Sequence, residues 1–149
     1  SAKLKCLTGK SAYVWQALVE LVRFPSPVYS ITINDVSHEI GSAVFANGHF
    51  YGGRFISVPA ARLEDPILYA CLLAGRGRWN LMRYGIALAG NRLARLSDVK
   101  IIAFEKAVID GLEGDPVHAD GDIIGSLPAT IRCDATPLYV LRPAGIPKS

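Results

Sequence analysis

Short apolar runs alternate with polar residues along most of the chain, and Gly, Pro, Asn and Asp interrupt them every few residues. Runs rich in β-branched and aromatic residues between such turn signals are typical of strands. Strands are predicted at residues 28–35, 40–45, 66–73, 99–104, 107–109, 117–119, 123–124, 129–133 and 138–141. Asn34-Asp35 is predicted to form the turn at the end of the first, and the apolar run at 66–73 is predicted to be buried. This spacing favours a mainly β (α+β) fold: an antiparallel β-sandwich or barrel-like domain with two helices packed on it.

The first predicted helix covers residues 11–24. Ala12, Trp15, Leu18 and Val22 recur there at three- and four-residue steps, the spacing that gives a helix one apolar face. Pro25 ends this pattern.

The second predicted helix covers residues 76–93. Apolar residues gather on one side of it, and four arginines lie elsewhere along it. The apolar residues are Trp79, Met82, Ile86 and Ala89, and the arginines are Arg76, Arg78, Arg83 and Arg92. The arginines leave two readings open, a solvated basic face or a peripheral contact with anionic lipid headgroups.

Three glycine-containing turns stand out. Asn47-Gly48 and Asp120-Gly121 predict hairpins, because both pairs tolerate positive φ. Gly52 and Gly53 lack side chains and permit either a β-bulge or close approach of the backbone to a ligand; the second makes them candidate substrate-binding residues.

Composition narrows the class of protein. A length of 149 residues predicts one domain, and 50% hydrophobic residues with a mean hydropathy of +0.27 suggest a thick core or a surface covered by another domain or a membrane. The net charge of +3 comes without runs of Lys or Arg, so nucleic-acid binding is not supported. Three cysteines without a Cys-x-x-Cys pair, and no apolar leader segment, indicate a reducing, cytoplasmic location. Ser1 in place of an initiator Met suggests a fragment.

Two carboxylates, Asp120 and Asp122, lie on either side of Gly121. Their spacing alone favours a plain hairpin, although carboxylates at i and i+2 can also converge to form a base or metal site. Asp65 has two readings as well, a turn cap or one hard oxygen ligand for Mg²⁺ or Ca²⁺.

Four motifs occur in an order that resembles the diacylglycerol kinase-like and sphingosine kinase-like lipid kinases of bacteria. They are Asn47-Gly48-His49-Phe50-Tyr51-Gly52-Gly53, Val58-Pro59-Ala60-Ala61-Arg62-Leu63-Glu64-Asp65, Ala119-Asp120-Gly121-Asp122 and Leu138-Tyr139-Val140-Leu141-Arg142-Pro143. The likeness runs from about residue 3 to residue 143 and covers the C-terminal, β-rich domain of that family.

The resemblance implies a two-domain enzyme that transfers the γ-phosphoryl group of ATP to a lipid hydroxyl, with Mg²⁺. It assigns a catalytic role to Asp120 and Asp122, and a structural Mg²⁺ to the Asp65 carboxylate and the carbonyls of Arg62 and Ile67. Residues 1–149 are then one lipid-side domain that is inactive alone, because the Gly-Gly-Asp-Gly motif of the N-terminal nucleotide-binding domain is absent from this sequence. Pro66 stands where the family usually has Gly.

Two other readings stay open. In one, the chain is a non-catalytic lipid- or ligand-binding β-domain and Asp120-Gly121 is only a turn. In the other, exposed sheet edges make it an oligomerisation module such as a homodimer.

Overall fold

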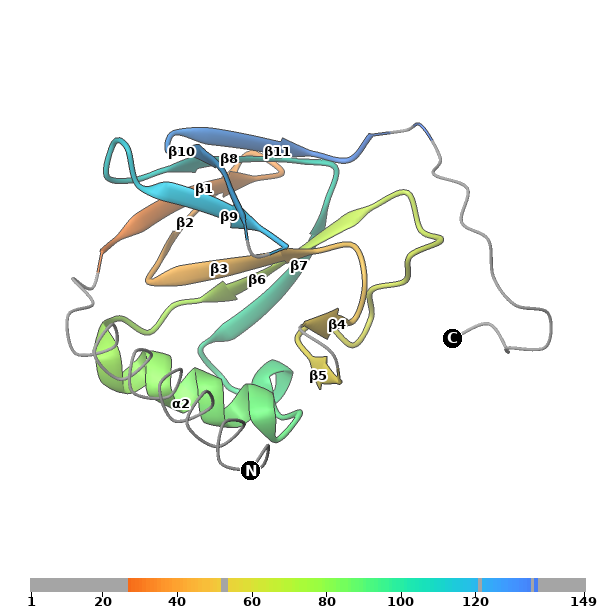
Figure 1. Ribbon diagram of the computed structural model, residues 1–149, viewed down its shortest axis with the longest axis vertical. Helices are drawn as coiled ribbons and strands as arrows, with labels where there is room; N and C mark the ends of the chain where they lie inside the picture. The colour runs from red at the N-terminus through yellow and green to blue at the C-terminus, as the bar shows by residue number, and fades with distance from the viewer. Residues whose placement is uncertain (1–26, 52–53, 121, 135, 137–149) are drawn as a thin grey trace, which may run out of the picture.

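The computed structural model describes residues 27–51, 54–120, 122–134 and 136. The chain forms two antiparallel sheets, two short hairpins and one α-helix in these ranges (Figure 1). The elements are β1 (Tyr29–Ile33), β2 (Val36–Ile40), β3 (Ser42–Ala46), β4 (Phe50–Tyr51), β5 (Phe55–Ile56), β6 (Leu68–Leu73), α2 (Gly77–Ala89), the 3₁₀ turn η1 (Leu93–Arg95), β7 (Val99–Phe104), β8 (Lys106–Asp110), β9 (Pro116–Ala119), β10 (Asp122–Ser126) and β11 (Ala129–Arg132).

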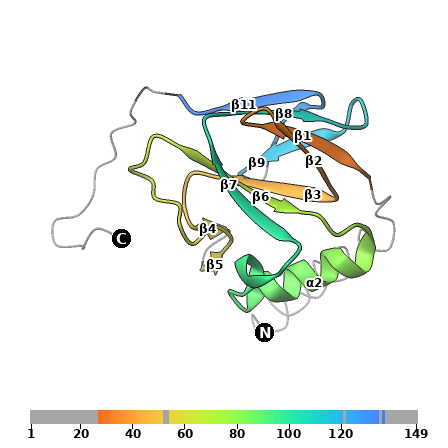
Figure 2. The same cartoon turned by 180° about the vertical axis from the view of Figure 1, so that it is seen from behind.

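Every strand pair is antiparallel. The larger sheet has the order β11-β8-β1-β2, the smaller has the order β3-β6-β7, and β10-β9 and β4-β5 form separate two-stranded hairpins. Figures 1 and 2 show the two sheets stacked, with α2 against the smaller one on the side away from the larger. The predicted mainly antiparallel β-sandwich is therefore confirmed.

The smaller sheet is buried on both faces, and β6 shows why. Ala70 and Leu72 join the core between the sheets, whereas Cys71 and Leu73 join a second core with Tyr84 of α2. Successive side chains of a strand point to opposite faces, so a strand between two apolar layers must be apolar at every position. This explains the continuous apolar run at 66–73, which was predicted as a buried strand.

The β1–β2 hairpin contains the predicted Asn34-Asp35 turn. Both residues have positive φ (51° and 62°), the conformation required by the two-residue turn that matches strand twist. The strand predicted at residues 40–45 is present as β3, but it begins only after Gly41, where the chain bends and moves from the larger sheet to the smaller.

Close packing of the backbone fixes this change of sheet. The Gly41 amide donates to the Leu73 carbonyl over 2.9 Å, and a Cβ on Gly41 would lie only 2.4 Å from the Gly75 carbonyl oxygen. No side chain can occupy this crossing without moving backbone.

The hairpin predicted at Asn47-Gly48 is wrong. β3 pairs with β6, and β4 pairs with β5, so the strands on either side of Gly48 do not pair with each other. The apolar strand β6 offers β3 a longer buried partner, and Gly48 packs instead against Leu63, whose Cδ2 would lie 3.3 Å from an added Cβ.

Helix α2 occupies most of the predicted segment 76–93, but its apolar residues divide between two faces. Tyr84 is buried against the smaller sheet, with Ala87 and Leu88 beside it. The predicted apolar side faces away: Trp79 is 71% exposed and Ile86 is 67% exposed. In the described ranges α2 is the sole α-helix, and no helix there is long and apolar enough to cross a membrane. The predicted helix at 11–24 and strand at 138–141 lie outside the described residues.

Candidate functional site

The hairpin β9–β10 carries the two candidate catalytic carboxylates. Asp122 pairs with Ala119, so the hairpin predicted at Asp120-Gly121 is present, although Gly121 itself lies outside the described residues. Asp120 has φ of 51°, a left-handed conformation that Asp and Asn tolerate better than other non-glycine residues. Both aspartates are exposed at the hairpin end, where an incoming group can reach them.

The rest of this hairpin is also largely exposed. Val117 is half-buried, whereas Ile123 and Ile124 are exposed on β10, where a β-bulge falls between Ile123 and Gly125. Adjacent strand residues normally point to opposite faces, so two exposed isoleucines in succession indicate that neither face of β10 is covered by the described residues.

The base of the hairpin, in contrast, is fixed to the sandwich. The Tyr29 hydroxyl donates to Asp115 Oδ2 over 3.0 Å, and the Leu127 amide donates to the Asp115 carbonyl over 2.9 Å. Gly111 allows this packing, because an added Cβ would lie 2.5 Å from the Tyr29 ring. Asp115 thus connects β1 to the point where β9 begins. No local signal in the sequence predicts this contact, because 86 positions separate Asp115 from Tyr29.

Replacing Tyr29 by Phe tests this anchor. Burial, with the hydrogen bond to Asp115, raises the pKa of Tyr29 from 10.0 to about 12. A raised tyrosine pKa stabilises the fold below pH 10, and this contribution disappears as the pH rises from 10 toward 12. Tyr29→Phe should lower the free energy of unfolding by about 1 kcal/mol at pH 8. Denaturant unfolding at several pH values should show that the difference in unfolding free energy between variant and wild type becomes smaller above pH 10. A difference that does not change with pH would contradict the proposed role of the Tyr29–Asp115 hydrogen bond.

The candidate metal ligands lie in the turn before β6. The Asp65 amide donates to the Arg62 carbonyl over 3.2 Å, so one tight, exposed turn contains both residues, and Ile67 follows where the chain enters the sheet. A carboxylate with two backbone carbonyls is a hard-oxygen set that fits Mg²⁺ or Ca²⁺ in type, and a carbonyl that accepts one hydrogen bond keeps a second lone pair. Among the described residues no three His, Cys, Asp or Glu side chains cluster as a metal site. Any ion there would depend on the backbone carbonyls.

Gly52 and Gly53 lie outside the described residues. On either side of them, the His49 carbonyl accepts from the Ser57 amide over 3.0 Å and thereby closes the loop that carries β4 and β5. Phe50 and Tyr51 are exposed on β4, so this loop presents aromatic surface.

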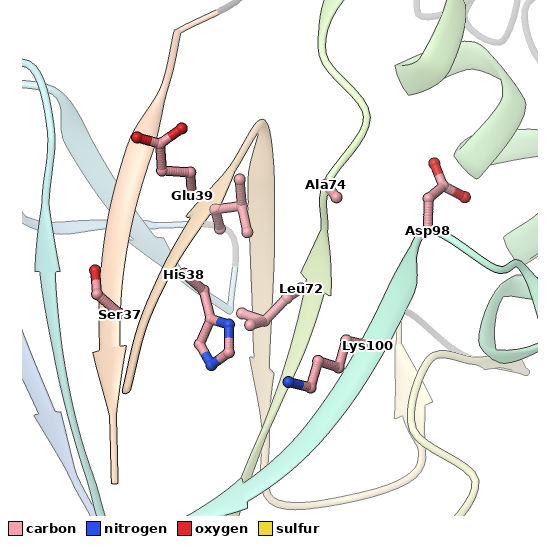
Figure 3. A pocket seen from close by; sticks show the side chains of 8 residues that line it. Ser37, His38, Glu39, Leu72, Ala74, Asp98 and Lys100 are labelled. Carbon is pink, nitrogen blue, oxygen red and sulfur yellow. The ribbon is translucent and has the colours of Figure 1, made fainter. Parts of the chain in front are cut away.

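A pocket of about 250 Å³ lies where the edge of the larger sheet meets the smaller sheet (Figure 3). The residues lining it come from β2, from the end of β6 and from the start of β7. They are Ser37, His38, Glu39, Ile40, Leu72, Ala74, Asp98 and Lys100. In Figure 3 the side chains of His38 and Lys100 extend toward each other beside Leu72. No local pattern in the sequence predicts this pocket, because its walls come together only when the two sheets stack.

Asp98, on the rim of this pocket, has a structural role. It accepts from the Tyr84 hydroxyl over 2.5 Å and pairs with Arg83, while the Gly75 amide donates to the Tyr84 hydroxyl over 2.7 Å. Burial acts to raise the pKa of Asp98, but the hydrogen bonds from Tyr84 and Arg83 outweigh it, so the pKa lies below the usual value. These contacts attach α2 to the start of β7.

The described contacts join the candidate site residues only in part. Arg62 and Asp65 share one turn, and Asp120 and Asp122 share one hairpin. Among the described residues, no hydrogen bond or ion pair links the turn to the hairpin.

The fold places this chain in the class of small antiparallel β-sandwich domains. Residues 1–142 match the family described as the YegS C-terminal NAD kinase beta sandwich-like domain, and the chain belongs to that family.

Relatives with known names agree with this assignment. A diacylglycerol kinase of Mycobacterium tuberculosis (strain ATCC 25618 / H37Rv) is 26% identical over 138 residues, which is 91% of this chain and 44% of the relative. The crystal structure of a diacylglycerol kinase from Bacillus anthracis str. Sterne aligns with a TM-score of 0.57 at 18% identity, over 72% of this chain and 38% of that one. A second structure from the same organism gives a TM-score of 0.59, also at 18% identity, over 77% and 42%. The chain thus spans less than half the length of the relatives it matches.

Proposed function

We propose that this chain is the C-terminal, lipid-side domain of a diacylglycerol kinase-like enzyme, which transfers the γ-phosphoryl group of ATP to a lipid hydroxyl. The supporting observation is the hairpin β9–β10, which presents Asp120 and Asp122 at an exposed end while its base is anchored through Asp115. The family assignment and the two kinases named above support the same reaction class.

In this proposal Asp120 or Asp122 orients the acceptor hydroxyl and takes its proton. Phosphoryl transfer depends mainly on positioning and on stabilising charge, so one well-placed carboxylate at the acceptor is what this half of the enzyme must supply. An N-terminal nucleotide-binding domain supplies the ATP site, so residues 1–149 alone do not phosphorylate lipid. The exposed Ile123 and Ile124 beside the carboxylates provide apolar surface for that domain or for the acceptor. The proposed enzyme acts in the cytoplasm, and it can do so as a monomer or as a homodimer.

Magnesium enters the proposal in two places. With ATP it neutralises phosphate charge during transfer, and a structural ion would be held by the Asp65 carboxylate with the carbonyls of Arg62 and Ile67. If that ion is present, millimolar Mg²⁺ should raise the Tm of the wild-type chain by a few degrees, and Asp65→Ala should abolish the increase. Glu64→Ala, a change to the neighbouring exposed carboxylate, is the matched control. If Mg²⁺ raised the Tm equally in the wild type, Asp65→Ala and Glu64→Ala, Asp65 would not be a metal ligand.

The reaction is tested by incubating the full-length protein with radiolabelled ATP and a panel of diacylglycerol, sphingoid bases and other lipid alcohols. Label is expected in one lipid class, and residues 1–149 alone should transfer none. If no lipid is labelled while the protein binds lipid regardless of substitutions at Asp120 and Asp122, the non-catalytic lipid-binding reading replaces this proposal.

A further inference from the structure

The outer side of α2 has the composition of a surface that contacts a membrane. Trp79, Met82 and Ile86 are exposed at three- and four-residue steps, so they form one stripe along the helix. We call these three residues the α2 stripe. It lies opposite Tyr84, the side chain by which α2 is buried on the smaller sheet.

Arginines flank this stripe on both sides. At about 100° per residue, Arg78 lies to one side of Trp79 and Arg83 to the other. Residues 76–95 contain five arginines and no Asp or Glu. Arg76 pairs with Glu39 and Arg83 pairs with Asp98, while Arg78, Arg92 and Arg95 are exposed and form no ion pair within the described part of the chain.

A helix with apolar residues on two opposite faces is normally covered on both faces. The positive charge around the α2 stripe indicates which kind of partner covers the outer face of α2. A second copy would bring arginines against arginines. The other amphipathic segment of this chain, 11–24, contains one acidic residue, Glu20, together with Arg23, and so offers little complementary charge. An anionic bilayer offers both an apolar layer and a continuous negative surface.

We propose that α2 docks on anionic phospholipid, with the α2 stripe inserted at the boundary between headgroups and acyl chains and the arginines on the phosphates. Trp is enriched at this depth because its ring is apolar and its N–H is polar. Arginine can extend its charged end to the headgroups while its stem covers apolar surface. The inference does not depend on the kinase assignment, because it concerns binding to a membrane and not phosphoryl transfer.

The test is sedimentation of the full-length protein with vesicles of phosphatidylglycerol and phosphatidylcholine, or of phosphatidylcholine alone. Binding is expected with phosphatidylglycerol at about 0.1 M salt and should be largely lost at about 1 M. Trp79→Ser/Ile86→Ser and, separately, Arg78→Gln/Arg92→Gln should each weaken it about tenfold or more. Leu112→Ser is the matched control, because Leu112 is 67% exposed, as is Ile86, but lies far from α2 in sequence, between β8 and β9.

Three results would overturn the proposal. Unchanged binding by both double variants would show that α2 is not the contact. A Tm lowered by several degrees in Trp79→Ser/Ile86→Ser would show that the α2 stripe is buried within the protein, by residues 11–24 or by another domain. A lower mass of that variant in light scattering would show that the α2 stripe joins two copies. If the lipid panel is never phosphorylated but the vesicle results hold, the kinase proposal fails and the membrane contact stands.

Discussion

Asp120→Asn in the full-length protein is expected to lower kcat for lipid phosphorylation by about 10² to 10⁴, the usual contribution of a positioned acid or base. Its Tm should stay within about one degree of wild type. Asn keeps the size of the side chain and tolerates the positive φ of 51° found at this position, so the β9–β10 hairpin should persist while the negative charge is lost. Parallel measurements of kcat and Tm on the two proteins make the comparison.

Two further variants separate chemistry from turn geometry. Asp122→Asn shows whether the second carboxylate shares the role, since Asp122 lies across the hairpin end from Ala119. Asp120→Ala should lose activity and also some stability, because Ala is disfavoured at positive φ. Wild-type turnover in Asp120→Asn would reduce Asp120-Gly121 to an ordinary turn and remove the carboxylate from the mechanism.

Gly41→Ala should cause the largest loss of stability from a single methyl group, about 3 kcal/mol or roughly 10 °C in Tm. The added Cβ would lie 2.4 Å from the Gly75 carbonyl oxygen and 3.2 Å from the Arg76 Cα. Both are backbone atoms, so relief requires the crossing between β2 and β3 to open. Thermal and denaturant melts measure the effect.

Gly85→Ala is the matched control for that experiment. An added Cβ at Gly85 meets no atom within 4 Å, and Ala stabilises a helix interior relative to Gly by up to about 1 kcal/mol. The same substitution should therefore raise the Tm in α2 and lower it at Gly41. A loss below 1 kcal/mol at Gly41 would show that the two segments separate easily.

Much of the fold could be predicted from local patterns. The apolar run of β6, the turn at Asn34-Asp35 and the hairpin at Asp120-Gly121 are all present. Each depends on residues close in sequence, which is where backbone preference and side-chain alternation act.

The errors arose where distant segments decide the outcome. Asn47-Gly48 favours a hairpin locally, but β3 gains more buried contact with β6, which lies more than 20 residues away along the chain. Trp79 and Ile86 belong to the apolar side predicted for the helix, yet Tyr84 is the residue buried on the sheet, because its hydroxyl reaches Asp98 and the Gly75 amide.

The candidate site could likewise be predicted from the sequence only in part. Its carboxylates could be found in the sequence, because Asp120 and Asp122 flank a glycine in a strong turn signal, and their order relative to the other motifs pointed to the lipid kinases. The hydrogen bond from Tyr29 to Asp115, and the pocket between His38 and Lys100, had no local signal. Both arise from pairs of residues at least 60 positions apart.

The sequence by itself determined the strand-rich architecture, the turns and the identity of the candidate carboxylates. Alternation of apolar residues and the positive φ tolerated by Gly, Asn and Asp act over a few residues. Only the tertiary structure decided that the chain changes sheets at Gly41, that Asp115 anchors the β9–β10 hairpin and that the Trp79 side chain of α2 is exposed. Each of these features depends on apolar surfaces that are far apart in the sequence. These surfaces are removed from water only when the sheets and the helix pack against each other.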